Sequence, residues 1–157
     1  MSIDKVNNYF KIYNMESRMR IFPVSSATVT LAAQALSCEP ARIAKTLSFL
    51  VKDRPILVVA AGDAYIDNGK YKSFFESKAK MIPADLVEKY IGHAVGGVCP
   101  FVVNSDVKVY LDVSLRRFKS VFPACGSSNS AIELTIDELE THSNAISWID
   151  VCKGWSP

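Results

Sequence analysis

The chain is poor in the residues that mark metal-binding and redox proteins. It has only 2 histidines and 4 cysteines among 157 residues. The cysteines are widely spread and none forms a Cys-x-x-Cys pair, so their spacing predicts neither a zinc site nor a redox motif. Free thiols are typical of a reducing compartment. We therefore expect no metal and no cofactor.

Long apolar runs are also absent. The longest run, from Ile56 to Ala61, has the length of a strand and falls far short of the roughly 20 residues that a membrane-spanning helix needs. The first residues, Met1 to Lys5, lack the basic and then apolar pattern of a secretory signal. These absences predict a cytoplasmic protein that makes no contact with a membrane.

An excess of charge of one sign is missing as well. The 18 basic and 16 acidic residues leave a net charge of only +2, whereas proteins that grip nucleic acid along their length are strongly basic. Any contact with nucleic acid must therefore be local. The candidate segments are Arg18 with Arg20, Lys70 to Lys80, and Arg116 to Lys119, although each alone is also typical of a solvated surface.

What remains is the composition of an ordinary globular domain, with 49% hydrophobic and 22% charged residues. The chain has no internal repeat, no low-complexity tract and no linker rich in Pro, Gly or Ser. Residues 1–157 are accordingly expected to form one free-standing domain. The sequence leaves its oligomeric state open.

Helical and strand-like segments alternate irregularly. The clearest hairpin joins strands at 45–51 and 56–61 through a turn at 52–55, and Thr135 and Glu138 have the spacing of a capping box at a helix start. Further helices are expected at 3–13, 27–36 (capped by Ser25 or Ser26), 67–77 and 83–91, a helical turn at 39–42, and strands at 81–82, 101–103, 107–112, 120–122, 131–134 and 146–151. This order predicts an α+β fold with a mixed, mostly antiparallel, curled (barrel-like) sheet and peripheral helices.

Lys45 is unusual for its position on a strand. Because side chains alternate between the two faces, Lys45 shares a face with the apolar Leu47, Phe49 and Val51. Withdrawing an uncompensated ammonium from water costs several kcal/mol. Lys45 is therefore either a strand-end lysine whose tip reaches water or a group at the mouth of a pocket, facing an anion.

The segment Gly96-Gly97-Val98-Cys99-Pro100 is the second candidate. Two glycines allow backbone conformations closed to other residues and let a ligand approach closely, while the proline stiffens the exit. The amides of Gly97, Val98 and Cys99 would then be free to face a carbonyl or an oxyanion. An ordinary turn has the same composition.

Taken together and in order, these segments resemble a known family. Ile43-Ala44-Lys45-Thr46-Leu47, Gly62-Asp63, Gly92 followed by Gly96 to Phe101, Val109 to Leu115, and Ala124-Cys125-Gly126 are similar to the YbaK-like prolyl-tRNA-editing domains. The resemblance covers about Ser25 to Leu139. It implies a barrel-like mixed sheet and a trans-editing hydrolase, an aminoacyl-tRNA deacylase that protects translation fidelity by cleaving the aminoacyl ester at the terminal adenosine of a mischarged tRNA.

The resemblance also implies roles for particular residues. The lysine of the family's Ala-Lys-Thr motif lies in the active site, which makes Lys45 the candidate catalytic residue. The Gly-x-x-x-Pro loop corresponds to Gly96 and Pro100, and its backbone would hold the aminoacyl end of the substrate. The candidate substrate-binding residues are Gly96, Gly97, Val98, Cys99, Pro100, Asp112 and Gly126. The implied partner is the acceptor end of aminoacyl-tRNA, with a synthetase or an elongation factor as candidate protein partners.

One departure concerns the substrate. Relatives closest to the cysteine-specific deacylases have a further glycine shortly after the loop proline, whereas this chain has Phe101-Val102-Val103. The departure argues against cysteine and leaves the amino acid and the tRNA open.

Two other functions stay open. The chain could be a non-catalytic module of the same fold that binds aminoacyl-tRNA or nucleotide ends. It could also be a cysteine hydrolase with Cys99 as nucleophile, although neither His93 nor His142 stands in a context that marks it as the base. The acidic residues Asp63 and Asp67 are interpreted as turn residues.

Overall fold

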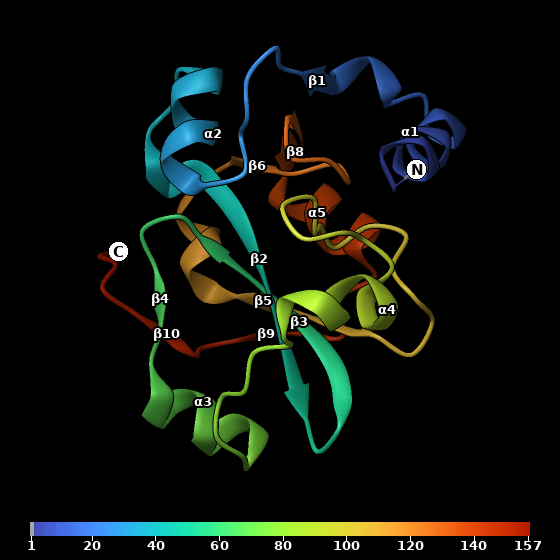
Figure 1. The fold of residues 1–157 in the computed structure, drawn as a ribbon. Helices are drawn as coiled ribbons and strands as arrows, with labels where there is room; N and C mark the ends of the chain where they lie inside the picture. The colour runs from blue at the N-terminus through green and yellow to red at the C-terminus, as the bar shows by residue number, and fades with distance from the viewer. Residues whose placement is uncertain (1) are drawn as a thin grey trace.

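A curled, mixed sheet forms the centre of the molecule (Figure 1). The structure, a computed structural model, describes residues 2–157. The sheet has the order β8-β6-β2-β3-β5-β9. Its strands are β2 (Ile43–Val51), β3 (Arg54–Ala61), β5 (Lys108–Asp112), β6 (Ser120–Pro123), β8 (Leu134–Thr135) and β9 (Ser147–Ile149).

The long hairpin of β2 and β3 is the framework of this sheet. The two strands pair in antiparallel register from Ala44 opposite Ala61 to Val51 opposite Arg54, and β6 pairs with β8 in the same sense. The pairs β2–β6, β3–β5 and β5–β9 are parallel. The predicted curled, mixed sheet of an α+β fold is confirmed, and it contains more parallel pairing than the hairpin signals indicate.

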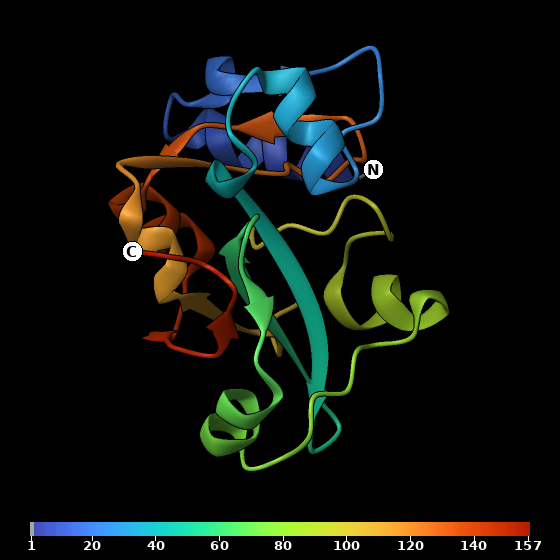
Figure 2. The same ribbon diagram turned by 90° about the vertical axis from the view of Figure 1, so that its left-hand side faces the viewer.

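Helices lie around the sheet and not within it (Figures 1 and 2). They are α1 (Ser2–Ile12), α2 (Val29–Leu36), α3 (Asn68–Phe75), α4 (Val87–Ile91) and α5 (Ile136–Ser143), with 3-10 turns η1 (Glu16–Arg18), η2 (Pro40–Arg42), η3 (Ala84–Leu86) and η4 (Val113–Arg117). Gly92 ends α4 in the left-handed conformation that glycine adopts at low cost. The expected helices are confirmed, but the cap of α2 is Thr28 and not Ser25 or Ser26.

Two small ribbons complete the fold. Strand β1 (Met19–Ile21) pairs with β7 (Ser130–Ile132), and β4 (Tyr65–Ile66) pairs with β10 (Cys152–Lys153). The strand expected at 101–103 is wrong, because Val102 has a φ of +52° and the segment runs as an irregular loop. Of the strand expected at 81–82, the structure keeps a single bridge between Phe49 and Met81.

The core lies between the hairpin and the elements around it. The C-terminal part of β3, from Leu57 to Ala61, is fully buried, as expected of a strand that is covered on both faces. Phe10 of α1 packs edge-to-face on Phe101, which ties the N-terminal helix to the irregular loop. Within residues 2–157, no helix is both long enough and apolar enough to cross a membrane.

Candidate functional site

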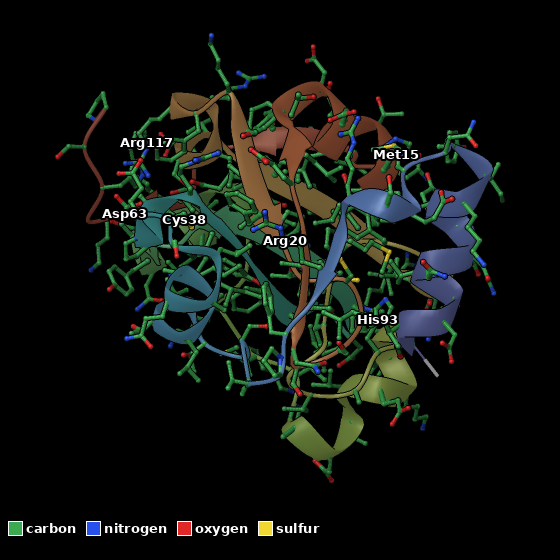
Figure 3. The ribbon with its side chains drawn as sticks, turned by 90° about the horizontal axis from the view of Figure 1, so that it is seen from above. Met15, Arg20, Cys38, Asp63, His93 and Arg117 are labelled. Carbon is green, nitrogen blue, oxygen red and sulfur yellow. The ribbon has the colours of Figure 1, made fainter. Side chains whose placement is uncertain are left out.

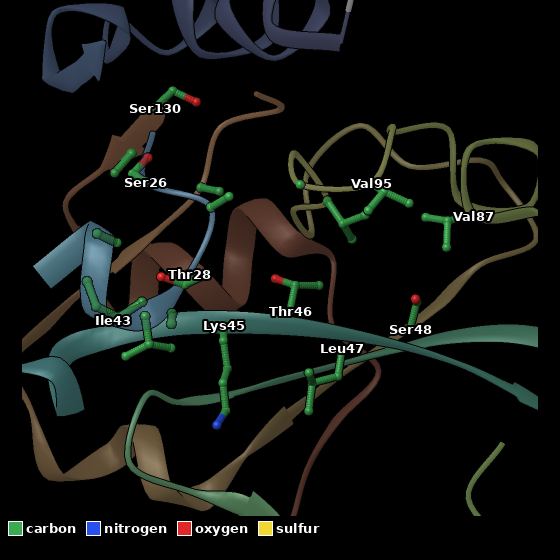
Figure 4. A pocket seen from close by; sticks show the side chains of 18 of the residues that line it. Ser26, Thr28, Ile43, Lys45, Thr46, Leu47, Ser48, Val87, Val95 and Ser130 are labelled. Atoms are coloured by element: carbon green, nitrogen blue, oxygen red, sulfur yellow. The ribbon is translucent and has the colours of Figure 1, made fainter. Parts of the chain in front are cut away.

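A cavity of about 470 Å³ lies between β2 and the loop that contains the two consecutive glycines (Figure 4). Its volume is typical of sites that bind small molecules. One wall is β2 from Ile43 to Ser48 and the opposite wall contains Val95, Gly96 and Val98. The remaining lining residues come from residues 26–32, which lead into α2, from residues 81–87, and from β6, β7 and the segment between them.

The two faces of β2 separate the cavity from Lys45. Figure 4 shows the side chains of Thr46 and Ser48 extending from β2 toward the side where Val95 lies, whereas Lys45 and Leu47 leave the strand on the other side. This alternation follows from strand geometry. Lys45 also borders the cavity, and since its side chain points away, it does so through the main chain of the strand.

The ammonium of Lys45 is half-buried and weakly held. Its Nζ lies 3.4 Å from the carbonyl oxygen of Gly62 and 4.5 Å from the ring centre of Tyr65. Burial lowers the pKa of Lys45, and the negative charge of Asp63 only partly opposes that effect. Lys45 forms no ion pair with any residue from 2 to 157. This cation is thus desolvated without a strong partner.

The nearby carboxylate of Asp63 is engaged by Arg117 instead (Figure 3). Arg117 donates to both oxygens of Asp63, with one distance of 2.9 Å, and also donates to the carbonyl oxygens of Ser114 and Ser156. The bond from Arg117 lowers the pKa of Asp63. Through Arg117, Asp63 therefore links the β3–β4 turn to η4 and to the C-terminal residues. The sequence predicts only a turn residue at this position.

The glycine loop contributes fewer free amides than its sequence indicates. The amide of Gly97 donates to the carbonyl oxygen of Ala94 at 3.0 Å, so the prediction that it is free to face a carbonyl or an oxyanion of a ligand is wrong. A Cβ on Gly97 would lie 2.9 Å from the backbone of Gly126. This close packing, and not contact with a ligand, requires glycine at 97. Gly96, with a φ of +90°, and Val98 are the residues of the loop that border the cavity.

Cys99 and Pro100 turn away from the cavity into the protein. The Sγ of Cys99 lies 3.5 Å from Nε2 of His93, so the structure does form the Cys-His pair that the sequence left open. That nitrogen, however, is 2.7 Å from the carbonyl oxygen of Phe101, which can only accept, so Nε2 carries the proton and cannot act as the base.

The surroundings of this pair keep both groups neutral. Both side chains have no exposed surface. Burial raises the pKa of Cys99 to about 12 and lowers the pKa of His93. Since the thiolate and not the thiol is the nucleophile, Cys99 is an inert core residue.

The structure does not bring Asp112 or Gly126 to the cavity. Asp112 is fully buried, with Oδ2 accepting from the amide of Ser114 and Oδ1 from the amide of Val151, both at 3.0 Å. Its carboxylate thus fixes the end of β5 and the segment after β9. Gly126 has a φ of +97° and packs against the backbone of Ser2 and Ile3.

The residues missed by the sequence interpretation are hydroxyl-bearing. Thr46 and Ser48 enter the cavity from β2, and Oγ1 of Thr46 is buried with no hydrogen-bond partner among residues 2–157. Their signal in the sequence is two polar residues at alternate positions of an otherwise apolar strand. Ser26, Thr28 and Ser130 also line the cavity, and they are brought there from distant segments.

Two of the predicted basic segments meet away from this cavity. Arg18, Arg20 and Lys119 line a second hollow of about 580 Å³, together with Glu133 and Glu138. Arg18 is paired with Glu138 at 2.8 Å, and Lys70, from the segment Lys70 to Lys80, is paired with Asp150 at 3.1 Å. The charges of these two residues are therefore engaged within the protein.

Comparison with known proteins decides the family. The model of the aminoacyl-tRNA editing domain matches residues 24–141, a range that includes β2, the glycine loop and every lining residue of the cavity. The chain belongs to the aminoacyl-tRNA editing domain family. The resemblance noted in the sequence is thereby confirmed.

Individual relatives of this editing domain differ in how much of their length is matched. The chain is 52% identical to the uncharacterized protein YwhH of Bacillus subtilis (strain 168) over 99% of both chains. It is 29% identical to the proline–tRNA ligase of Levilactobacillus brevis over 51% of this chain, which is only 14% of the ligase. A solved structure, described as a candidate trans-editing enzyme for prolyl tRNA synthetase, is 26% identical with a TM-score of 0.86 over 98% of both chains.

Proposed function

We propose that this editing domain is a free-standing deacylase, one that hydrolyses the ester between an amino acid and the terminal adenosine of mischarged tRNA in the cytoplasm. The observation that carries the proposal is the cavity between β2 and the glycine loop, whose lining residues lie wholly within the range matched by the editing-domain model. Its volume of about 470 Å³ suits an aminoacyl group and part of the attached nucleoside.

Hydrolysis of an aminoacyl ester needs only modest catalysis by the protein. An aminoacyl ester is more labile than a peptide, and attack by water on its carbonyl carbon builds negative charge on the carbonyl oxygen before the ribose oxygen leaves. Val98 borders the cavity, and we expect its backbone amide to stabilise this charge, because a backbone donor is fixed before the reaction begins. Holding the nucleoside and the ester in one orientation supplies the rest of the rate.

Lys45 is the proposed catalytic residue. Its ammonium would balance the developing charge or hold the terminal phosphate or ribose, although in this structure it lies on the other side of β2 from Thr46. A 3.4 Å contact with a carbonyl oxygen and a contact with the Tyr65 ring hold it only weakly. The long side chain can exchange these contacts for a phosphate or an oxyanion, which attracts an ammonium more strongly.

The test is the release of labelled amino acid from a panel of mischarged tRNAs. We expect the wild type to release at least one amino acid faster than buffer does, and Lys45→Ala to lose at least tenfold of that rate. The control is Lys52→Ala, because Lys52 is an exposed lysine on the same hairpin. If no mischarged tRNA is hydrolysed above the buffer rate, the proposal fails; if Lys45→Ala retains full activity, the role of Lys45 fails.

A non-catalytic module that binds aminoacyl-tRNA is the second candidate. The orientation of Lys45 away from the cavity favours it. Such a module would bind mischarged tRNA and release no amino acid, and it could deliver the tRNA to a synthetase or receive it from an elongation factor.

The cysteine hydrolase finds no support in the geometry, because Cys99 is buried and its thiol is neutral. Cys99→Ala is therefore expected to retain the deacylation rate per folded molecule.

A further inference from the structure

The stretch of β2 around Thr46 is open along one edge. Along a strand, successive residues direct their backbone N–H and C=O groups toward opposite edges. The carbonyl of Ser48 accepts from the amide of Ile82 at 3.1 Å, and the amide of Leu50 donates to the carbonyl of Lys80 at 2.9 Å. The even-numbered residues of β2 therefore point away from β3, toward the outer edge of the strand.

Thr46 falls in a gap on that outer edge. The pairing of β2 with β6 covers Ile43 and Ala44 only, and the next contact is the one made by Ser48. As an even-numbered residue, Thr46 points its N–H and C=O into the gap between these two contacts, beyond the last residue of β2 that pairs with β6. Its side-chain Oγ1 is buried and has no hydrogen-bond partner among residues 2–157.

The cavity lies over this gap. Its lining includes Thr46 together with residues from both ends of the gap, namely Phe122 on the β6 side and Ile82 on the other. Unpaired backbone groups away from water are costly, and nearly all of those in folded proteins find a partner. A buried hydroxyl without a partner, beside backbone groups of the same residue that face a largely apolar cavity, is the arrangement expected where a ligand supplies hydrogen bonds.

An aminoacyl group carries the complementary pattern. Its ammonium, Cα and carbonyl have the order and spacing of one residue in a strand, and in an antiparallel hydrogen-bonded pair two residues exchange both N–H···O bonds. An extended peptide recognised at a sheet edge uses the same groups. The lining side chains that point into the cavity are uncharged. No carboxylate of the lining therefore competes with a backbone carbonyl for the ammonium of the aminoacyl group.

We propose that the aminoacyl group binds beside Thr46 as if it were one residue of a neighbouring strand. The C=O of Thr46 accepts from the α-ammonium, and the N–H of Thr46 donates to the ester carbonyl oxygen. This inference rests on the proposed function and adds to it a substrate class: esters of amino acids with a free α-ammonium, and not N-acylated ones. The Thr46 amide then faces the oxygen on which negative charge develops, so it becomes a donor to the oxyanion.

The experiment uses two non-hydrolysable amides, 3′-alanylamino-3′-deoxyadenosine and its propionyl counterpart, which lacks only the ammonium. Each is titrated into the ¹⁵N-labelled full chain and followed by NMR. We expect the alanyl compound to shift the Thr46 amide proton downfield more than any other amide, and the propionyl compound to bind at least tenfold more weakly. Thr46→Val keeps the backbone and removes Oγ1, so it should keep the alanyl preference.

The outcomes are distinct. Equal affinity for the two compounds, absence of alanyl binding at millimolar concentration, or saturation without a shift at Thr46 would overturn the proposal. Loss of the alanyl preference in Thr46→Val would also overturn it, because recognition would then belong to the side chain. If the alanyl compound binds as expected while no mischarged tRNA is hydrolysed, the deacylase function fails and the binding role of Thr46 stands.

Discussion

At the residue scale, adjacent residues of β2 have side chains in different surroundings. Lys45 and Thr46 are neighbours in sequence, yet one points toward Gly62 and Tyr65 and the other into the cavity. The alternation of faces is readable from the sequence, and it places Lys45 with Leu47 as the structure does. Which face borders a cavity depends on α2, the glycine loop and β6, which come from distant parts of the chain.

The desolvation of Lys45 leads to a prediction about stability. Burial lowers the pKa of its ammonium, which means that the charged form is disfavoured in the folded protein. Lys45→Met keeps the length of the side chain and removes the charge. We expect the melting temperature at neutral pH to rise by ~2 °C while deacylation falls at least tenfold, as is common where function requires a strained site.

Scanning calorimetry of the wild type and Lys45→Met checks this expectation. Lys52→Met is the matched control, because the side chain of Lys52 is 67% exposed and should show no such gain. A lower melting temperature for Lys45→Met would mean that its contacts with Gly62 and Tyr65 outweigh the cost of burying the charge.

At the scale of elements, local signals predicted local structure well. The capping box of α5 is present as expected: Oγ1 of Thr135 accepts from the amide of Glu138 at 3.1 Å, and Oε1 of Glu138 accepts from the amide of Thr135 at 2.9 Å. The segment 101–103 shows the limit. Its apolar residues have the composition of a strand. The backbone N–H of Asn104, however, donates to the carbonyl oxygen of Ile91 in α4, and the segment before it forms a loop.

The cap of α5 gives a test at this scale. Thr135→Ala removes one bond of the box, and losses of this kind cost about 1 kcal/mol. The structure predicts a decrease of about that size in the free energy of unfolding, measured by urea titration, with no change in deacylation because Thr135 does not line the cavity. Thr141→Ala, an exposed position on the same helix, should change stability little. Equal losses in the two variants would show that the box contributes nothing.

At the scale of the whole molecule, ion pairs between distant segments join the parts of the fold. Arg117 links Asp63 to the C-terminal residues, and Arg18 links η1 to Glu138 of α5. Neither pair is recognisable in the sequence, since their members lie far apart. The parallel pairs β3–β5 and β5–β9 likewise join distant segments, which is why hairpin patterns reveal β2–β3 and leave these contacts unseen.

These pairs predict acid sensitivity. The bonds from Arg117 and Arg18 lower the pKa values of Asp63 and Glu138 below those of the unfolded chain. A carboxyl with a lowered pKa stabilises the fold above its unfolded pKa, roughly 4 for these groups, and loses that contribution as the pH falls through its folded pKa. We expect the melting temperature to fall as the pH is lowered from roughly 4 through the folded pKa values of these two groups.

Asp63→Asn isolates one pair. Because Asp63 is partly exposed, its pair with Arg117 is worth about 1 kcal/mol. The variant should therefore be less stable than the wild type at pH 6, and this difference should shrink as the pH falls below roughly 4. A constant difference across this range, by thermal denaturation followed by circular dichroism, would assign the effect to something other than the charge of Asp63.

The proposed role of the cavity between β2 and the glycine loop is to hold the aminoacyl end of mischarged tRNA. Val95 borders this cavity and Val24 does not, although both residues are 61% exposed. The direct measurement is the single-turnover deacylation rate of Val95→Trp beside that of Val24→Trp, on whichever mischarged tRNA the wild type hydrolyses fastest. Val95→Trp is expected to slow deacylation at least tenfold with an unchanged melting temperature, while Val24→Trp leaves the rate within twofold. Equal rates in both variants would contradict this role of the cavity.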